Sequence, residues 1–398
     1  MKDQKWTMKY DLGIEPLPLA VNTSAEYFER EREKIFRHAW LNVGRVEDLP
    51  AAGSYFVKEL AILRTSALVV RGRDGEIRSF HNMCKHRGNK VVRDGIGSGT
   101  GRGFSCNFHG WTYDLTGQLV YVPDEGEFFG LDKCANGLTP IATEVWEGFI
   151  FINAEPRESL REWLGELADQ FQGYYEKDWH CFAHNAADVQ VNWKVFIDAF
   201  AEGYHVPTVH GRTLPEAITP EMNSLCHPIM IRLFKRNRSI IFGANPSYQP
   251  TPVEKVLASQ VAAPVFPALK SQLENLPPGV NPTKDAYWGF DINIVFPVTY
   301  FVNWANGMLL IYHFWPLTVD RTRWEMKLYW DKPKNAAERL NQEYVKTMTA
   351  CVVREDLTTQ ESTQSMLRSG ATSHMNLSDQ EIAVRHGYKV VEEALNNA

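Results

Sequence analysis

The chain has 398 residues, which is long enough for two domains with separate hydrophobic cores. Its hydrophobic content of 44% and charged content of 23% are ordinary for a globular protein, and its formal net charge of -6 argues against a nucleic-acid partner. It contains no run of about 18 apolar residues and no signal-peptide core near its start, so we expect a cytoplasmic protein without a membrane partner.

The first third of the chain changes from a helical pattern to a strand pattern. Residues 24–40 begin with a serine that could cap a helix and carry apolar residues near helical spacing. From about residue 42 to 155, short apolar runs alternate with turn signals such as Asp74-Gly75 and Thr116-Gly117. These patterns predict an amphipathic helix followed by a small antiparallel sheet domain.

Helical and strand patterns both occur after Pro156. Apolar residues at helical steps predict helices within 160–171, 188–205 and 335–369. Longer apolar runs predict strands within 229–243 and 290–330, the second with a hairpin at Asn306-Gly307. The proline-rich residues 247–283 predict a surface excursion.

Two histidines lie five residues apart in the segment AFAEGYHVPTVH. On a continuous helix His205 and His210 would point about 140° apart, and Pro207 should end such a helix near Val206. The two side chains can therefore converge only across a helix end. Glu202 and His205, by contrast, would share one helical face. Metal ligands, a pH-sensitive pair and ordinary helix-end polar residues all fit this pattern.

Two short motifs in the predicted sheet domain hold four potential metal ligands. MCKHRGNK contains Cys84 and His86, SCNFHGW contains Cys106 and His109, and a glycine follows each pair. Two ligands from each of two loops suit a four-coordinate metal centre. A structural zinc site and coincidental burial are the alternatives.

These two motifs resemble those of a Rieske [2Fe-2S] domain. The resemblance implies that Cys84 and Cys106 hold one iron and that His86 and His109 hold the other. Neutral imidazole ligands raise the potential of such a cluster to about -150 to +300 mV, so it accepts electrons readily.

A second metal site would use an electron from that cluster. His205 and His210 need one carboxylate to complete a two-His-one-carboxylate triad, which leaves positions for O2 at Fe(II). Glu355 and Asp356 are about 100° apart on the predicted long helix, and periodicity does not choose between them. The order of NWK, Tyr-His, a second His and a late Glu-Asp pair resembles the catalytic domain of Rieske nonhaem iron oxygenases, the ring-hydroxylating alpha subunits. The resemblance implies that Asp356 is the ligand.

The resemblance covers nearly the whole chain and implies an α+β fold. A small all-β Rieske [2Fe-2S] domain at 42–155 would be inserted near the N-terminus of the catalytic domain. That catalytic domain, at 156–398, would be a helix-covered antiparallel sheet that binds mononuclear iron, with residues 1–41 packing on it.

Glu202 and Asp198 acquire roles through the same resemblance. Most family members have aspartate at the position of Glu202, where it connects the first iron-binding histidine to a cluster histidine of the neighbouring subunit. Glu202 can accept the same hydrogen bonds, so we expect an electron bridge from the partner subunit's His109 to His205. Asp198 lies where relatives often place a polar residue near the iron. Members that act on quaternary ammonium compounds are among the minority with glutamate at position 202.

The implied function is that of a terminal oxygenase in a head-to-tail homotrimer, with or without a small beta subunit. It would use O2 and electrons from a ferredoxin or an NAD(P)H-dependent reductase. The 12 Trp, 15 Tyr and 21 Phe favour an aromatic or other hydrophobic substrate, and hence a role in aromatic hydrocarbon catabolism by dioxygenation or monooxygenation. Candidate wall residues are Phe196, Phe200, Phe242, Phe296, Trp304, Phe314 and Trp315.

Two alternatives remain open at this point. The same metal sites could demethylate or hydroxylate a quaternary ammonium or methoxy compound, with aromatic rings enclosing the cation. The chain could also be a hydrophobe-binding protein with structural zinc. Four basic residues could anchor a substrate carboxylate or simply form a solvated strand: Arg232, Lys235, Arg236 and Arg238.

Overall fold

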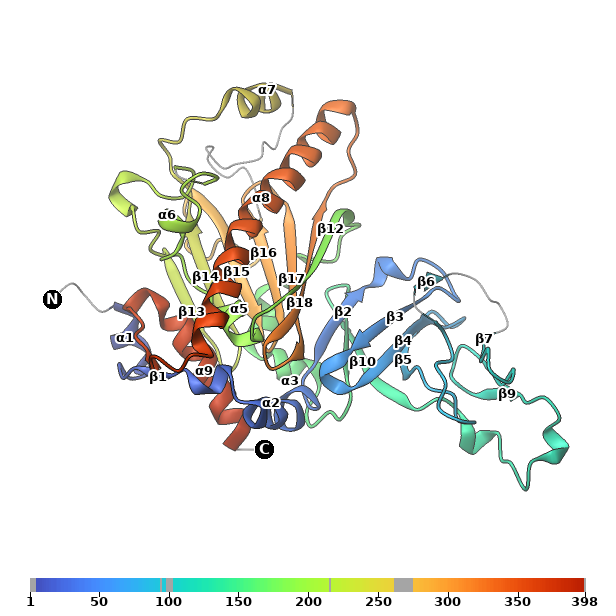
Figure 1. Cartoon of the computed structure of the whole chain (residues 1–398). Coiled ribbons are helices and arrows are strands. Elements are labelled where there is room, and N and C mark those ends of the chain that lie inside the picture. The colour runs from blue at the N-terminus through green and yellow to red at the C-terminus, as the bar shows by residue number, and fades with distance from the viewer. Residues whose placement is uncertain (1–4, 94, 98–102, 215, 261–274, 397–398) are drawn as a thin grey trace. The chain divides into compact units, whose positions relative to one another are not determined.

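The fold was analysed in a computed structural model, which describes residues 5–93, 95–97, 103–214, 216–260 and 275–396 (Figure 1). The chain divides into two compact units. One comprises residues 36–163, and the other comprises residues 1–35 together with 164–398. Among the described residues, no helix combines the length and the apolarity that crossing a lipid bilayer requires.

The unit 36–163 is built on antiparallel sheets, as the sequence predicts. Its larger sheet has the order β2 (Leu41–Arg45), β11 (Phe149–Asn153), β10 (Pro140–Trp146), β5 (Ile77–His81), β4 (Thr65–Arg71), β3 (Tyr55–Leu60) and β6 (Ile96–Gly97). A smaller sheet contains β7 (Phe104–Ser105), β8 (Thr112–Tyr113) and β9 (Leu119–Tyr121). Gly75 and Gly117 adopt positive φ values of 86° and 83° in the turns that join β4 to β5 and β8 to β9.

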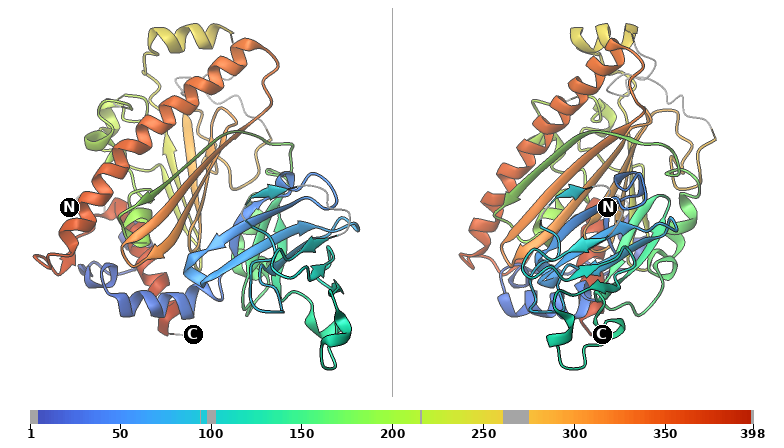
Figure 2. Two further views of the ribbon diagram at one scale, coloured as in Figure 1. Left: turned by 45° about the vertical axis from the view of Figure 1, so that its right-hand side comes forward. Right: turned by 90° about the vertical axis from the view of Figure 1, so that its right-hand side faces the viewer.

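The second unit is a seven-stranded antiparallel sheet covered by helices (Figures 1 and 2). Its strand order is β12 (His180–Val189), β18 (Arg321–Trp330), β17 (Leu309–Thr318), β16 (Thr299–Trp304), β15 (Trp288–Val295), β14 (Arg238–Gly243) and β13 (Met230–Leu233). Helix α8 (Ala336–Leu367) runs across one face of this sheet in all three views, and α5 (Trp193–Asp198) packs against β17 and β18. The predicted hairpin at Asn306-Gly307 joins β16 to β17.

The N-terminal and C-terminal segments both belong to this second unit. Strand β1 (Leu17–Pro18) pairs with β19 (His374–Met375). The N-terminal helices are α1 (Lys5–Tyr10) and α2 (Ala25–Glu31), and the C-terminal helix is α9 (Ile382–Asn396). The Ser24 side chain accepts a hydrogen bond from the Tyr27 amide and caps α2, as predicted. A short π-helix, Arg32–Phe36, follows α2 directly. The helical structure therefore ends before residue 40, where the predicted segment 24–40 ends.

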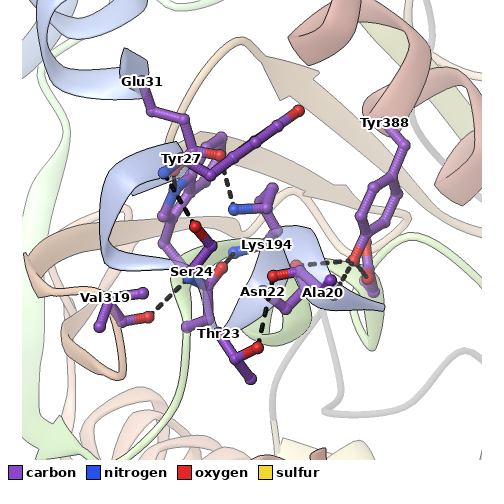
Figure 3. Close-up of polar contacts among 12 residues, drawn as sticks. Ala20, Asn22, Thr23, Ser24, Tyr27, Glu31, Lys194, Val319 and Tyr388 are labelled. Carbon is purple, nitrogen blue, oxygen red and sulfur yellow. Dashed lines mark hydrogen bonds and ion pairs between the residues drawn. The ribbon is translucent and has the colours of Figure 1, made fainter. Parts of the chain in front are cut away.

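A buried ion pair attaches the N-terminal segment to α5 (Figure 3). Lys194 Nζ lies 2.5 Å from Glu31 Oε1, and the Trp193 indole donates to Glu31 Oε2 at 2.9 Å. The side chains of Lys194 and Glu31 are 4% and 0% exposed, so burial lowers the pKa of Lys194 and raises the pKa of Glu31. The pair's charges oppose both shifts. Such a pair fixes where α5 lies, because separating it would leave a buried charge without compensation.

Three segments differ from what the sequence predicts. Residues 160–171 form two short helices, α3 (Leu160–Leu164) and α4 (Glu166–Gln170), because Gly165 between them has a φ of 56°. Helix α5 begins at Trp193, capped by Asn192, and residues 188 and 189 pair with β18 instead. The proline-rich region contains an unexpected helix, α7 (Pro252–Gln260), while its residues 261–274 lie outside the described part of the chain.

Candidate metal sites and substrate cavity

His205, His210 and Asp356 converge on one point in the second unit. Each offers one ligand atom, and the three atoms lie within 4.8 Å of one another. His205 Nε2 is 3.7 Å from Asp356 Oδ1, and His210 Nε2 is 3.1 Å from the same oxygen. Two imidazole nitrogens and one carboxylate oxygen form the donor set of a facial triad, which suits Fe(II) and leaves coordination positions open.

A single helical turn brings the two histidines together. His205 precedes and His210 follows α6 (Val206–Val209), and their ring centroids are 5.2 Å apart. The expectation that Pro207 ends a helix is wrong, because this proline lies in the first turn of α6. A helix leaves its first amide groups without internal partners, so a proline there costs no hydrogen bond.

The segment before His205 is also not helical, which corrects a second expectation. Helix α5 ends at Asp198, and the Phe200 and Ala201 amides make turn-type bonds to the carbonyls of Ile197 and Asp198. A Cβ atom at Gly203 would lie 2.3 Å from the Cys226 carbonyl oxygen, so only glycine allows this close approach. Glu202 therefore reaches His205 across a turn, not along a helical face.

Each of the two histidines forms a hydrogen bond with its own glutamate through its Nδ1 atom. His205 Nδ1 lies 2.6 Å from Glu202 Oε1, and the His205 amide donates to Glu202 Oε2 at 3.1 Å. His210 Nδ1 lies 2.9 Å from Glu355 Oε2. A carboxylate is only an acceptor, so the Nδ1 atoms carry protons, and each Nε2 atom, which lies near Asp356, would offer its lone pair to a bound cation. This arrangement fits a bound cation.

The tandem Glu355-Asp356 thus supplies two different contacts. Asp356 is 4% exposed and faces both Nε2 atoms, whereas Glu355 contacts His210 from the opposite edge of the ring. Burial lowers the pKa of His210, but hydrogen bonds to Asp356 and Glu355 outweigh it and raise the pKa. The sequence did not reveal the role of Glu355, although two adjacent acids about 100° apart on one helix can reach two sides of one histidine.

An apolar cavity of about 120 Å³ opens beside these three residues. Phe290 forms the centre of its aromatic wall and stacks on Phe242 at 5.0 Å and on Trp304 at 4.8 Å. Phe200 and Tyr312 also line the cavity. Of the seven aromatic residues proposed from the sequence, Phe200, Phe242 and Trp304 lie in this wall. Phe196 and Phe314 instead pack on each other in the core, and Phe296 and Trp315 are buried elsewhere.

The basic strand residues do not reach this cavity. Arg232 donates to Gln170 Oε1 at 2.5 Å, Arg238 is buried, and Lys235 is exposed. Within the described ranges of the chain, neither lysine nor arginine lines the cavity. Of the two interpretations left open by the sequence, anchoring of a substrate carboxylate by one of the four therefore has no support at this cavity.

A larger cavity of about 370 Å³ is lined by His205 and Asp356 and also by Asp198. Asp198 Oδ2 accepts a hydrogen bond from the Tyr388 hydroxyl at 2.8 Å, and Asn22 Nδ2 donates to that hydroxyl at 2.9 Å. Burial raises the pKa of Asp198 to about 7. Glu202 lines both cavities and so lies between them.

Two matching loops hold the four other candidate ligands in the unit 36–163. The Gly88 amide donates to the Cys84 carbonyl and the Gly110 amide donates to the Cys106 carbonyl, both at 2.9 Å. The two glycines have φ values of 77° and 76°, which side chains rarely adopt. A glycine after each ligand pair is therefore required for both loops to close in the same way.

The four side chains lie together at the ends of these loops. Cys84 and Cys106 are buried, and the rings of His86 and His109 are 4.6 Å apart. His109 is exposed to solvent.

Neighbouring side chains fix this group. The Trp111 ring stacks on His86 at 5.1 Å, the Tyr113 hydroxyl lies 3.4 Å from Cys84 Sγ, and Asn89 Nδ2 donates to Cys106 Sγ at 3.5 Å. Hydrogen-bond donors next to sulfur stabilise thiolates. Two thiols on one side and two imidazoles on the other fit a Rieske [2Fe-2S] cluster.

Family models match both units. Residues 39–139 match the Rieske [2Fe-2S] domain, and residues 175–397 match the ring hydroxylating alpha subunit (catalytic domain). The first match is to a domain that binds [2Fe-2S], and the second is to a catalytic domain typical of mononuclear iron.

Several curated proteins resemble part of the chain. The glycine betaine monooxygenase oxygenase subunit of Chromohalobacter salexigens is 33% identical over 208 residues, which is 52% of this chain and 45% of that protein. The carnitine monooxygenase oxygenase subunit of Escherichia coli K12 is 30% identical over 206 residues, 49% of this chain and 52% of that protein. The large oxygenase component of the Pseudomonas aeruginosa naphthalene 1,2-dioxygenase system is 32% identical over 209 residues, 49% of this chain and 44% of that protein. The chain spans about half the length of the curated relatives it matches.

Solved structures share the fold over nearly the whole chain. The quaternary ammonium Rieske monooxygenase CntA in complex with an inhibitor aligns with a TM-score of 0.76 at 19% identity, covering 97% of both chains. Naphthalene 1,2-dioxygenase from Rhodococcus sp. bound to indole aligns with a TM-score of 0.75 at 20% identity, covering 98% of this chain and 96% of that one. The chain therefore belongs to the ring-hydroxylating alpha subunit family and carries a Rieske [2Fe-2S] domain, as its sequence motifs predict.

Proposed function

We propose that this chain is a terminal oxygenase component that uses O2 and electrons from a ferredoxin or reductase to oxidise a compact hydrophobic substrate. The observation that carries the proposal is the position of three convergent ligand atoms, from His205, His210 and Asp356, at the wall of an aromatic cavity. Ligand atoms beside an apolar pocket place a substrate next to the metal and keep water away from it.

In this proposal the two metal groups have distinct protein ligands. His205 Nε2, His210 Nε2 and Asp356 would hold Fe(II), while Cys84, Cys106, His86 and His109 would hold the [2Fe-2S] cluster. Bound Fe(II) with open positions supplies O2 activation, and the cluster supplies electrons one at a time. The protein orients the substrate and limits access of water.

Electrons would reach this iron through Glu202. Its Oε1 already binds His205 Nδ1, and a carboxylate can accept a further hydrogen bond from a second imidazole. The exposed His109 suits that contact if the partner subunit's His109 docks beside Glu202 in a head-to-tail homotrimer, with or without a small beta subunit. Asp198 would fix the wall of the larger cavity, beside Glu202 and His205, through its bond to Tyr388.

The cavity favours a small, uncharged substrate. Its volume of about 120 Å³ is similar to that of an engineered apolar cavity of about 150 Å³ that binds benzene. Its aromatic and aliphatic wall offers dispersion contacts, and neither lysine nor arginine is among the described residues that line it. A single-ring hydrocarbon or a comparable hydrophobe therefore fits, which is consistent with a role in aromatic hydrocarbon catabolism.

Quaternary ammonium oxidation is the second candidate. The stacked faces of Phe242, Phe290 and Trp304 could hold a trimethylammonium group by cation-π attraction, and relatives named for glycine betaine and carnitine support this chemistry. A betaine also carries a carboxylate, which would lack a basic partner among the described residues that line this cavity. An ammonium or methoxy compound without a carboxylate fits better than a betaine.

A coupled substrate screen tests the proposal. Purified protein with a surrogate reductase would be given toluene, choline and glycine betaine in turn, with O2 uptake and oxidised product both measured. We expect substrate-dependent O2 uptake with toluene and weak or no uptake with glycine betaine, and none with any compound in the His210→Ala variant. Turnover of choline alone would select the second candidate. A colourless protein that contains only zinc would reject both and support a hydrophobe-binding protein.

A further inference from the structure

Glu355 connects the long helix α8 to the loop that carries His210. Its Oε2 atom lies 2.9 Å from His210 Nδ1 and accepts a hydrogen bond from Thr213 Oγ1 at 2.6 Å. The Thr213 amide in turn donates to the His210 carbonyl at 3.0 Å. One carboxylate oxygen therefore holds two side chains of the same turn, and the turn's own backbone holds them to each other.

We propose that Glu355, fixed by Thr213, is a positioning residue that sets the tautomer and ring orientation of His210 for metal binding. The inference rests on the proposed metal site and adds a residue to it. His210 is 3% exposed, so its ring has little freedom to meet water, and Glu355 is its partner at Nδ1. With the proton held at Nδ1, the lone pair of Nε2 is available to a cation bound beside Asp356.

The placement of Glu355 makes this effect specific. It is the residue next to Asp356 on α8, so the ligand carboxylate and the positioning carboxylate approach His210 from the same rigid helix. A shift of α8 would move both contacts together. Thr213 removes the remaining freedom of the Glu355 side chain, which is 25% exposed and would otherwise sample other rotamers.

His205 has an equivalent contact with Glu202, but the two glutamates differ in their surroundings. Glu202 lines both cavities, where a further partner could bind it, whereas Glu355 lines neither. Thr213 and His210 account for the contacts of its carboxylate. Glu355 is therefore suited to holding a ligand in place and not to electron transfer.

Metal titration of variants tests the proposal without using oxygenase turnover. Mononuclear iron would be removed from the holoprotein by a chelator, the cluster would be kept, and Co²⁺ binding would be measured by calorimetry. We expect Glu355→Ala and Glu355→Gln to weaken Co²⁺ binding by about 10- to 100-fold, the range found when such supporting partners are lost. Thr213→Val should weaken it by a smaller factor, and Thr213→Ser should restore wild-type affinity.

Glu361→Gln is the matched control. Glu361 lies on the same helix and accepts a hydrogen bond from the Gln190 backbone amide at 3.0 Å, so Glu361→Gln likewise neutralises a carboxylate that connects α8 to another segment. Both Gln variants should change the melting temperature of the metal-depleted protein similarly, but only Glu355→Gln should change Co²⁺ affinity. Equal Co²⁺ affinities in wild type and both Gln variants would overturn the role of Glu355. Absence of Co²⁺ binding in the wild type would instead reject the proposed metal site itself.

Discussion

His210 Nε2 lies 3.1 Å from Asp356 Oδ1, although the two residues come from a short turn and from the middle of a 32-residue helix. Helix α6 and helix α8 must therefore keep a fixed relative position for this contact to exist. Phe196, Phe200 and Phe314 pack on one another between α5 and the sheet, and the Lys194–Glu31 pair fixes α5, which precedes α6 in the chain. The stability of this part of the core and the geometry of the site are thus linked.

Replacing Glu202 should slow the arrival of electrons without emptying either metal site. A charge-assisted hydrogen bond is about twice as strong as a neutral one, so Glu202→Gln should weaken the hydrogen-bonded connection through residue 202 by about 1.4 kcal/mol. This loss corresponds to a roughly tenfold lower rate of electron transfer. The measurement is a single-turnover experiment with the reduced cluster, with iron content checked in parallel. Wild-type single-turnover rates in this variant would argue against an electron bridge at Glu202.

Breaking the buried ion pair should destabilise the second unit strongly. Lys194→Met leaves the Glu31 carboxylate buried without its partner, which should cost about 3–5 kcal/mol in free energy of unfolding. Adding Glu31→Leu should recover much of that loss, because no charge then remains buried. Urea unfolding would measure both effects. The exposed pair Arg339–Glu343 is the control, where Arg339→Met should cost only about 0–1 kcal/mol. A similar small loss at Lys194 would refute the structural role of the pair.

Asp198 should make stability depend on pH. Its pKa is raised from the usual 3.8 to about 7, so between these values the folded protein holds a proton that the unfolded chain has released. The free energy of unfolding should therefore fall as the pH rises from 4 to 7, by at most about 1.4 kcal/mol per pH unit. In Asp198→Asn this contribution disappears.

Urea unfolding of the wild type and of Asp198→Asn at pH 5 and pH 7 would measure how much the free energy of unfolding of each protein changes with pH. Asp291, whose pKa burial raises to about 8, contributes equally to both proteins and cancels. Charged neighbours of Asp198, namely Arg238, Lys194 and Glu381, are likewise the same in both. Parallel pH profiles would show that Asp198 is ionised in the folded protein at pH 5.

The aromatic wall separates the two substrate candidates. Phe290→Leu keeps an apolar side chain of similar size but removes the ring between Phe242 and Trp304. If the substrate is neutral, KM should change by less than about threefold. If the substrate is an ammonium ion, the loss of about 1–2 kcal/mol of cation-π attraction should raise KM by roughly 5- to 30-fold. We expect the smaller change, and KM measured for both substrate types provides the comparison.

The sequence predicts the metal-binding motifs better than it predicts how they meet. The spacing of Cys84, His86, Cys106 and His109 is visible in the chain itself, and both seven-stranded sheets follow from apolar runs separated by turn signals. Pro207 was misinterpreted because the residues around a proline that ends one helix can look the same as those around a proline that begins another. Local context does not distinguish the two cases.

Other features depend on contacts between distant segments. The bond from Glu355 to His210 and Thr213 requires α8 to lie beside α6, which no local pattern specifies. Likewise, Phe242, Phe290 and Trp304 face one cavity because of strand register, whereas Phe314 on a neighbouring strand packs in the core. Periodicity indicates that such residues are buried, but it does not show which of them border a cavity.

Metal analysis of the wild type and of Asp356→Ala, combined with visible spectra, tests the central claim most directly. The wild type should be red-brown and contain about three irons per chain, two in the cluster and one at His205, His210 and Asp356. Asp356→Ala should contain about two irons, keep the cluster spectrum and lose O2 uptake, while Glu343→Ala on the same helix should match the wild type. A zinc-only wild type, or an Asp356→Ala variant that retains the third iron and full turnover, would contradict the account.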